Sequence, residues 1–415
     1  MIYPERWKQL RERYEDSTKP RKMLTIDGGG IRGLLALGIL QSIEAILAEG
    51  RGGKNFRLCD YFDYIAGTST GAIVAAGLAR GMSVDELIKF YQNLGHQIFE
   101  PTSILHRLSS FYKADPLREN LRTVFNANRG ENYDPQSPDR NLFPENLKCL
   151  LLVVTRNVST DSPWPISSNP DARYNDPKRL DCNLQIPLWQ LVRASTAAPI
   201  YFPPEVLNWD PTDPKKSFTF VDGGVTPYNN PAFLLFRMAT LPAFRLGWTT
   251  GEKNLQIVSV GTGSAASPNS KPHEIIPQNL VGLPGTLMYG MQVDQDTNCR
   301  TVGRCVFGEP LDREIRDLTH RQAPEDASFE AWLQAPHKPL SEDQGRAFLY
   351  ARYNANLTAE GLSQLGLSTI DPAKVQTLDA VDQIDNLLKI GQVAGQQVKL
   401  EHFGSFAATT KGAAR

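Results

Sequence analysis

One local pattern occurs twice near the start of the chain: a short apolar strand, a glycine-rich turn and an apolar helix. In the first copy the strand covers 23–26, the turn runs from Asp27 to Gly33, and the helix covers 34–47. In the second copy a strand at 61–66 is followed by a turn at 67–71 and a helix at 72–78. Successive strand–turn–helix units are typical of α/β folds, whose parallel strands are covered by helices. We therefore predict an α/β protein with a mostly parallel central sheet.

The rest of the chain extends this pattern. Further strands are predicted at 149–154, 218–221 and 255–260. The polar, proline-containing segments 157–181 and 264–277 are predicted to be surface loops. Beyond about residue 294 the sequence changes character, and Asp371-Pro372 is typical of a helix start, here for a helix reaching Leu388.

Composition excludes several classes of protein. Lys and Arg number 44 against 45 Asp and Glu, so the net charge of −1 argues against a basic nucleic-acid-binding surface. Five scattered cysteines include no C-x-x-C pair, which argues against a zinc ribbon and fits reduced thiols in the cytoplasm. The first 22 residues are charged and lack the apolar region of a signal peptide. Apolar stretches such as 72–79 fall far short of the ~20 residues of a membrane span. We expect a cytoplasmic protein that is at most peripheral to a membrane.

Gly67-Thr68-Ser69-Thr70-Gly71 is a G-x-S-x-G motif between a predicted strand and a predicted helix. In that context the serine occupies a sharp, exposed turn, and the flanking Gly67 and Gly71 leave room for strained backbone. The amides and partial positive charge at the start of the following helix face the same point. Ser69 is therefore a candidate nucleophile, although a plain glycine-rich turn would have the same sequence.

Gly28-Gly29-Gly30-Ile31-Arg32-Gly33 formally matches the dinucleotide fingerprint G-x-G-x-x-G. A nucleotide-binding unit would need an acidic residue after a second strand, whereas Glu44 and Glu49 fall on or at the end of the predicted helix. No P-loop sequence is present. An oxyanion hole is the alternative use, with the amides of Gly28, Gly29 and Gly30 exposed to a developing negative oxygen. Arg32, which directly precedes Gly33, could then support the loop or attract an anionic headgroup.

Asp222-Gly223-Gly224 directly follows the predicted strand 218–221. An aspartate at the carboxyl end of a buried strand lies where open α/β sheets place their sites, although Asp-Gly turns are common. The three motifs together are more specific than any one of them.

These motifs resemble those of the patatin-like phospholipase family. The resemblance extends over about 22–263 and includes the segments 194–204 and 229–231. It implies a three-layer α/β/α fold acting on lipid acyl esters with a Ser69–Asp222 dyad, an acyl-enzyme intermediate and no metal or organic cofactor. It also implies an oxyanion hole at Gly28–Gly30, supported by Arg32, Gly33, Gly67, Gly71, Gly223 and Gly224.

We accordingly divide the chain into a charged leader (1–21), a patatin-like catalytic domain (22–293) and a mainly helical C-terminal extension without an assigned role (294–415). The expected partners are a phospholipid or other lipid ester and a membrane surface, which the basic residues Lys19, Arg21 and Lys22 could contact. Nucleic acid is not an expected partner.

Two alternatives remain open at this point. An α/β-hydrolase with a Ser69–Asp222–His273 triad would satisfy the order of such triads, but His273 lies in a polar loop. A ligand-switched effector or binding protein, with latent activity controlled by a small-molecule activator, would use the same glycine-rich loop differently.

Overall fold

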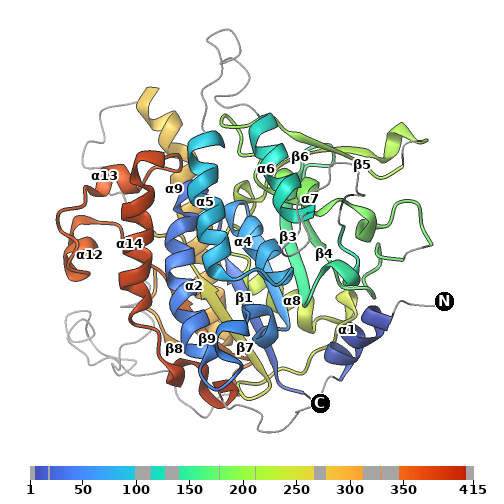
Figure 1. Cartoon of the computed structure of the whole chain (residues 1–415), viewed down its shortest axis with the longest axis horizontal. Helices are drawn as coiled ribbons and strands as arrows, with labels where there is room; N and C mark the ends of the chain where they lie inside the picture. The colour runs from blue at the N-terminus through green and yellow to red at the C-terminus, as the bar shows by residue number, and fades with distance from the viewer. Residues whose placement is uncertain are drawn as a thin grey trace.

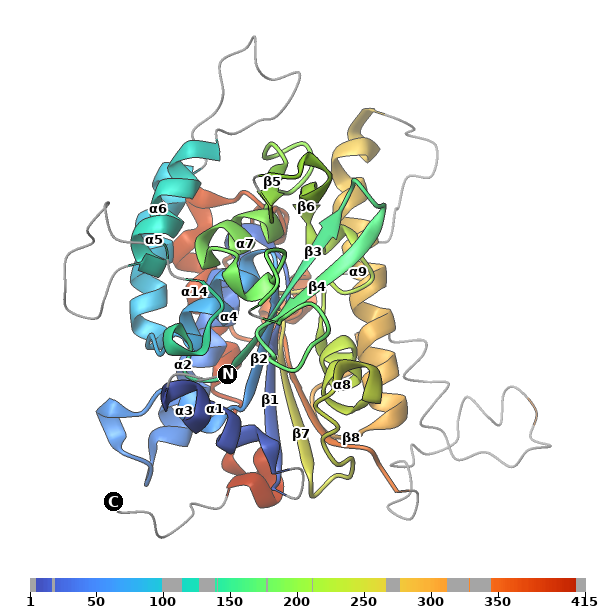
Figure 2. The same ribbon diagram turned by 90° about the vertical axis from the view of Figure 1, so that its right-hand side faces the viewer.

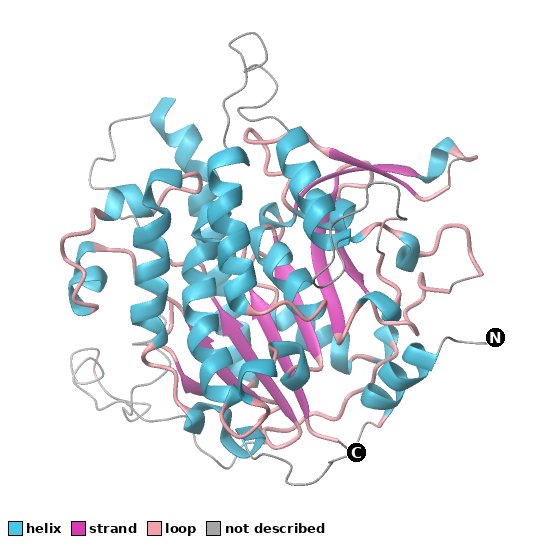
Figure 3. Cartoon of the chain, viewed as in Figure 1, coloured by secondary structure: helices cyan, strands magenta, loops and turns pink. Residues whose placement is uncertain are grey.

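In the computed structural model of the protein, the described strands form one nine-stranded sheet (Figures 1 and 3). The structure describes residues 5–16, 19–98, 114–126, 139, 141–176, 178–210, 212–265, 277–311, 328 and 345–407. The strand order is β5-β6-β3-β2-β1-β7-β9-β8, with β4 paired to β3 beside this path. The strands are β1 (Arg21–Ile26), β2 (Tyr64–Thr68), β3 (Leu150–Asn157), β4 (Ser162–Ser167), β5 (Glu205–Asn208), β6 (Ser217–Asp222), β7 (Leu255–Val260), β8 (Arg304–Phe307) and β9 (Leu349–Tyr353). Pairing is parallel from β3 through β2, β1, β7 and β9 to β8, and antiparallel where β4, β5 and β6 join one side.

Helices cover both faces of this sheet. Figure 2 shows α2, α5, α6 and α14 on one face and α8 and α9 on the other, which confirms the predicted three-layer α/β/α fold. The helices are α1 (Glu5–Glu15), α2 (Gly33–Ala48), α3 (Leu58–Tyr61), α4 (Thr70–Ala79), α5 (Val84–Ile98), α6 (Ala114–Asn126), α7 (Leu188–Ser195), α8 (Ala232–Thr240), α9 (Pro277–Val302), α12 (Ala359–Gln364), α13 (Pro372–Val375) and α14 (Ile384–Gly395).

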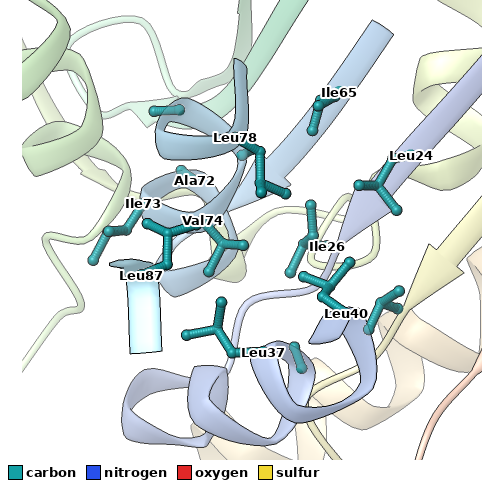
Figure 4. Close-up of a cluster of buried hydrophobic side chains, with 14 of the residues drawn as sticks. Leu24, Ile26, Leu37, Leu40, Ile65, Ala72, Ile73, Val74, Leu78 and Leu87 are labelled. Carbon is teal, nitrogen blue, oxygen red and sulfur yellow. The ribbon is translucent and has the colours of Figure 1, made fainter. Parts of the chain in front are cut away.

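The main core lies between β1, β2 and the helices α2, α4 and α5. Figure 4 shows side chains from these five elements converging, among them Leu24, Leu40, Val74 and Leu87. Helix α2 is apolar all round because it is covered on several sides, by the sheet, by α5 and by α14. Burying one such leucine contributes about 2 kcal/mol.

The prediction that every apolar stretch is too short to span a membrane is wrong for one segment. This segment, Gly30–Ala48, comprises helix α2 and the turn before it. By length and composition alone this segment is long and apolar enough, and it is the one such helix found in the described part of the chain. Two thirds of it is buried inside the fold, however, as in the core helix of a water-soluble domain.

Two predicted segments differ from the structure. The strand predicted at 61–66 begins further along the chain, as β2, because the preceding residues form α3. At the start of α3 the Asp60 carboxylate accepts a hydrogen bond from the Arg57 amide. The loop predicted at 157–181 contains β4, which pairs with β3. The prolines at 163 and 165 made the sequence look like a loop. They are tolerated in β4 because, among the described strands, β4 pairs with β3 alone.

The helix predicted from Pro372 to Leu388 is also divided. Asp371 caps its start as expected, accepting the Ala373 amide, but α13 ends at Val375 and α14 begins at Ile384. Between them the Leu378 carbonyl accepts a hydrogen bond from the Ile31 amide, in the turn after β1. This tertiary contact displaces the helical hydrogen bonds that the local sequence favours.

The expected boundary at residue 293 lies inside α9, and both β8 and β9 belong to the same sheet as β1 and β7. Helix α14 packs along α2, with Gly391 so close that a Cβ there would lie 2.1 Å from the Leu35 carbonyl (Figure 1). Strands β8 and β9 and helix α14, all after residue 293, are therefore part of the central layers.

Candidate active site

Ser69 lies in a strained turn between β2 and α4. Its φ of 56° and ψ of −126° are rare for a residue with a side chain. The neighbouring glycines permit the turn: a Cβ on Gly67 would lie 2.0 Å from the Gly71 carbonyl, and one on Gly71 would lie 2.3 Å from the Ile26 carbonyl. The G-x-S-x-G spacing thus follows from close backbone packing, and it places Ser69 at the N-terminus of α4.

Asp222, the last residue of β6, contacts Ser69 directly. The Ser69 hydroxyl donates to Asp222 Oδ2 over 2.6 Å, and the Gly224 amide donates to Asp222 Oδ1 over 2.6 Å. Both side chains are buried. Gly223 is needed beside them because a Cβ there would lie 2.2 Å from the Val154 carbonyl. Two residues 153 positions apart are thereby brought into one hydrogen-bonded pair.

Burial raises the pKa of the Asp222 carboxyl to about 7, while its hydrogen bonds from Ser69 and Gly224 and the charge of Arg193 oppose this rise. An aspartate in water has a pKa near 4 and is a weak base. A carboxyl with a pKa near neutrality can accept a proton from a neighbouring hydroxyl and return it later. This pair therefore has the geometry and the basicity for nucleophilic catalysis.

The loop after β1 lies opposite this pair. The Gly28 amide donates to the Asn229 carbonyl over 3.1 Å, and the Thr262 hydroxyl donates to the Gly28 carbonyl over 2.8 Å. The amides of Gly29 and Gly30 have no hydrogen-bond partner among the described residues, and both glycines line the cavity described below. Of the three candidate oxyanion donors, Gly29 and Gly30 are thus the two that are free to bind a ligand oxygen.

Arg32 and Gly33 stabilise this loop. The Arg32 side chain is buried and donates from Nε to the Gly29 carbonyl over 3.3 Å. Burial lowers the pKa of its guanidinium to about 10, so Arg32 stays charged near neutral pH. A Cβ on Gly33 would lie 2.3 Å from the Thr70 hydroxyl, so glycine there lets α2 approach the start of α4.

Sequence patterns did not single out the contribution of α7. The Ser195 hydroxyl accepts the Ser69 amide over 2.9 Å and donates to the Val154 carbonyl over 2.6 Å. Arg193 is fully buried near Asp222, and the Asp222 amide donates to the Ala197 carbonyl over 3.0 Å. The one signal from sequence was that Ser195 and Ala197 lie in the family-like segment 194–204, whereas Arg193 lies just before it.

A cavity of about 130 Å³ opens at Ser69 and Asp222. Its walls are mostly apolar and come from distant parts of the chain, including α9 and the turn after α13. They include Ile31, Ile73, Leu117, Pro199, Ile200, Tyr201, Phe202, Val225, Met288 and Leu378. By volume it resembles a cavity that binds a molecule of the size of benzene, so it can hold about six carbons of an apolar chain.

A scan against protein families matches residues 24–236, slightly more than half of the chain, to the family described as patatin-like phospholipase. The chain belongs to the patatin-like phospholipase family. Ser69, Asp222 and the predicted oxyanion-loop residues lie inside the matched range. Met288 and Leu378 of the cavity wall lie beyond it, as does His273 of the alternative triad.

Three curated relatives of this patatin-like chain are phospholipases or patatins. A cGAMP-activated phospholipase of Vibrio cholerae is 30% identical over 67% of this chain and 73% of its own length. A cGAMP-activated phospholipase of Escherichia coli is 31% identical over 59% and 63%. Patatin-17 of Solanum cardiophyllum is 30% identical over 59% and 61%, so the match spans less than two thirds of the last two relatives.

His273, the third member of the alternative triad, lies outside the described residues. Among the described residues lining the cavity of this patatin-like protein there is no histidine. Groups of His, Cys, Asp or Glu that could hold a metal ion are also absent from the part of the chain that the structure describes.

Proposed function

We propose that this protein is a serine acyl hydrolase that cleaves carboxylic esters of membrane lipids, with Ser69 as nucleophile and Asp222 as general base. The 2.6 Å contact between the Ser69 hydroxyl and the Asp222 carboxylate, at the wall of an apolar cavity, carries this proposal. Membership of a phospholipase family supports a lipid substrate.

In the first half-reaction Ser69 Oγ attacks the ester carbonyl and its proton passes to Asp222. The carbonyl oxygen becomes an anion, which the amides of Gly29 and Gly30 and the N-terminus of α4 stabilise. Collapse of this intermediate breaks the ester bond, and the leaving alcohol takes the proton from Asp222. The products of this step are the alcohol, here a lysolipid, and an acyl-serine.

In the second half-reaction Asp222 accepts a proton from water, and the resulting hydroxide equivalent attacks the acyl-serine. A second oxyanion forms at the same two amides. Its collapse returns the proton to Ser69 and releases the fatty acid, which restores the starting state.

Contact with the membrane is part of this proposal. The cavity holds only part of a long acyl chain, so the rest must extend past its rim. Ile200, which lines the cavity, is 46% exposed, and Leu287, which precedes the lining residue Met288 on α9, is 52% exposed. Apolar side chains at the entrance can enter a lipid surface without the help of net positive charge.

Covalent labelling with a fluorophosphonate tests the nucleophile, and mass spectrometry of products from a phospholipid extract tests the reaction. Wild type and Ser363→Ala, which changes an exposed serine on α12, should label and should release fatty acid. Ser69→Ala and Asp222→Asn should release none. Labelling that persists in Ser69→Ala, or an unchanged lipid extract with wild type, would refute the proposal.

The direct Ser69–Asp222 contact favours a dyad over a triad, because a triad places an imidazole between the serine and the carboxylate. His273→Ala is therefore expected to retain activity. Loss of activity in this variant, with its thermal stability unchanged, would favour the triad.

A second candidate function, a phospholipase switched on by a small molecule, is favoured by the two relatives that are cGAMP-activated phospholipases. We propose cGAMP as the first activator to test. Faster labelling of Ser69 and faster release of fatty acid on addition of cGAMP would support it. Equal rates with and without cGAMP would count against it.

A further inference from the structure

We propose that residues beyond the family match position the oxyanion loop, and that Arg352 on β9 is the positioning residue that does so through Asp27. This inference rests on the proposed function, because it assigns a role to residues that hold Gly29 and Gly30 in place. It gives a catalytic purpose to a part of the chain in which no sequence motif could be recognised.

Arg352 makes two parallel contacts with Asp27, the residue directly before Gly28. Its Nη1 donates to Asp27 Oδ1 over 2.9 Å and its Nη2 contacts Asp27 Oδ2 over 2.5 Å. Nη1 also donates to the Ser259 hydroxyl on β7 over 2.7 Å. Both charged side chains are buried, so water does not compete for these contacts.

A planar guanidinium that binds both oxygens of one carboxylate fixes the orientation of that carboxylate. Burial raises the pKa of the Asp27 carboxyl, and the contacts with Arg352 oppose this rise. A buried ion pair is often replaceable by apolar side chains without loss of stability. Stability alone therefore does not account for this pair, whereas a requirement for a fixed loop direction at Asp27 does.

The other end of the loop is held from the same part of the chain. The Ile31 amide donates to the Leu378 carbonyl over 2.9 Å. Gly30, with φ of 59°, packs so closely there that a Cβ would lie 2.1 Å from that carbonyl oxygen. Arg352 acts on the residue before Gly28 and Leu378 on the residue after Gly30, so the two candidate donors are fixed from both sides.

This arrangement matters because oxyanion stabilisation depends steeply on geometry. Removing one donor typically reduces kcat by about 10² to 10³-fold, and a displacement of about 1 Å can cost about 10²-fold. Loosening the Asp27–Arg352 contact should move donors and leave the Ser69–Asp222 pair intact. The effect should therefore fall on kcat and on ligands that form an oxyanion, more than on KM.

The test compares wild type with Arg352→Lys, Arg352→Met and the double variant Asp27→Asn with Arg352→Met. Arg346→Met is the matched control, because Arg346 is only partly buried and donates a hydrogen bond to the Thr301 carbonyl, away from the loop. Hydrolysis of a short, soluble p-nitrophenyl ester gives kcat, KM and their pH dependence. The final extent of fluorophosphonate labelling counts correctly folded sites, so that kcat is expressed per labelled site.

We expect Arg352→Lys to reduce kcat per labelled site by at least tenfold, with KM within about threefold of wild type and the inflection near pH 7 unchanged. Affinity for a trifluoromethyl ketone, which forms an oxyanion adduct on the serine, should fall in parallel. Arg346→Met should match wild type in each measurement.

An Arg352→Lys variant with wild-type kcat per labelled site and wild-type ketone affinity would overturn the inference, even if its melting temperature fell. The lysine variant decides the matter if Arg352→Met does not fold, because lysine keeps the charge and loses the paired geometry. A wild-type protein without Ser69-dependent turnover would instead overturn the proposed function, and the inference with it.

Discussion

Replacing Asp222 by asparagine should abolish activity and at the same time stabilise the protein above neutral pH. Asparagine has the same shape as aspartate: its oxygen can accept the Gly224 amide and its nitrogen can donate to the Ser69 hydroxyl. It cannot accept a proton, so the general base is lost and kcat should fall by about 10³-fold or more. What changes for folding is that a buried ionisable group is replaced by a neutral one.

The size of the stabilisation follows from the pKa of Asp222, which burial raises from 3.8 in the unfolded chain to about 7. Between these values the folded protein holds a proton that the unfolded chain has released, so stability decreases as pH rises. Each pKa unit corresponds to about 1.4 kcal/mol. The pKa difference therefore lowers the free energy of unfolding by about 4 kcal/mol at pH 8 and about 2 kcal/mol at pH 5, and the asparagine variant avoids both losses.

Thermal unfolding at several pH values measures this difference. An unfolding entropy of about 2.1 cal/mol/K per residue gives about 0.9 kcal/mol/K for 415 residues. The Tm of Asp222→Asn should then exceed that of wild type by about 4 °C at pH 8 and by about 2 °C at pH 5. Ser69→Ala is the control for lost activity, because it removes the nucleophile and keeps the carboxyl.

A Tm difference that stays constant between pH 5 and pH 8 would refute the reasoning, because it would mean that the pKa of Asp222 is the same in the folded and unfolded states. A variant less stable than wild type at pH 8 would also contradict it. A pH-dependent gain of the same size in Ser69→Ala would show that the carboxyl is not its source.

Three other predictions concern the same site and its rim. The kcat/KM of wild type should rise with pH through an inflection near pH 7, because Asp222 acts as a base only when it is ionised. A pH profile measured with a soluble ester tests this, and a flat profile from pH 5 to 8 would contradict it. Ser195→Ala should lower both kcat and Tm, because it leaves the Ser69 amide and the Val154 carbonyl without hydrogen bonds, at a cost of about 1 to 3 kcal/mol each. Calorimetry and steady-state kinetics measure the two effects, and wild-type values of both kcat and Tm would contradict this prediction. Ile200→Asp should weaken binding to phospholipid vesicles in flotation about tenfold, since about half of this side chain is exposed at the cavity and can enter the lipid. Leu241→Asp, 42% exposed just after α8, should not weaken it, and an equal loss in both variants would argue against this rim as the contact.

Much of the fold could be predicted because its signals are local. The turn containing Gly67 and Gly71 was recognisable from sequence, since only glycine fits where backbone atoms approach so closely. The strand–turn–helix order indicated an α/β fold, and the family motifs indicated its class. Errors arose where tertiary contacts outweighed local preference, as at Leu378, where a hydrogen bond to the loop after β1 interrupts a predicted helix.

The candidate site was only partly accessible to sequence reasoning. Ser69 and Asp222 could be paired as candidates because each sits in a recognisable motif, but their 2.6 Å contact and the raised pKa of Asp222 depend on burial. Gly28 shows the limit most plainly: its motif is the same as that of Gly29 and Gly30, yet its amide is already bound to the Asn229 carbonyl.

The sequence by itself determined which residues have the right chemistry: a serine in a strained turn, an aspartate after a strand and a run of glycine amides. Only the tertiary structure decided which of them meet, which amides remain free and what holds them. Arg352 lies 325 positions from Asp27 and in no motif, yet β9 places it against that carboxylate. The physical reason is that a motif records constraints on neighbouring backbone, whereas charge pairing and burial depend on which strands are adjacent in the sheet.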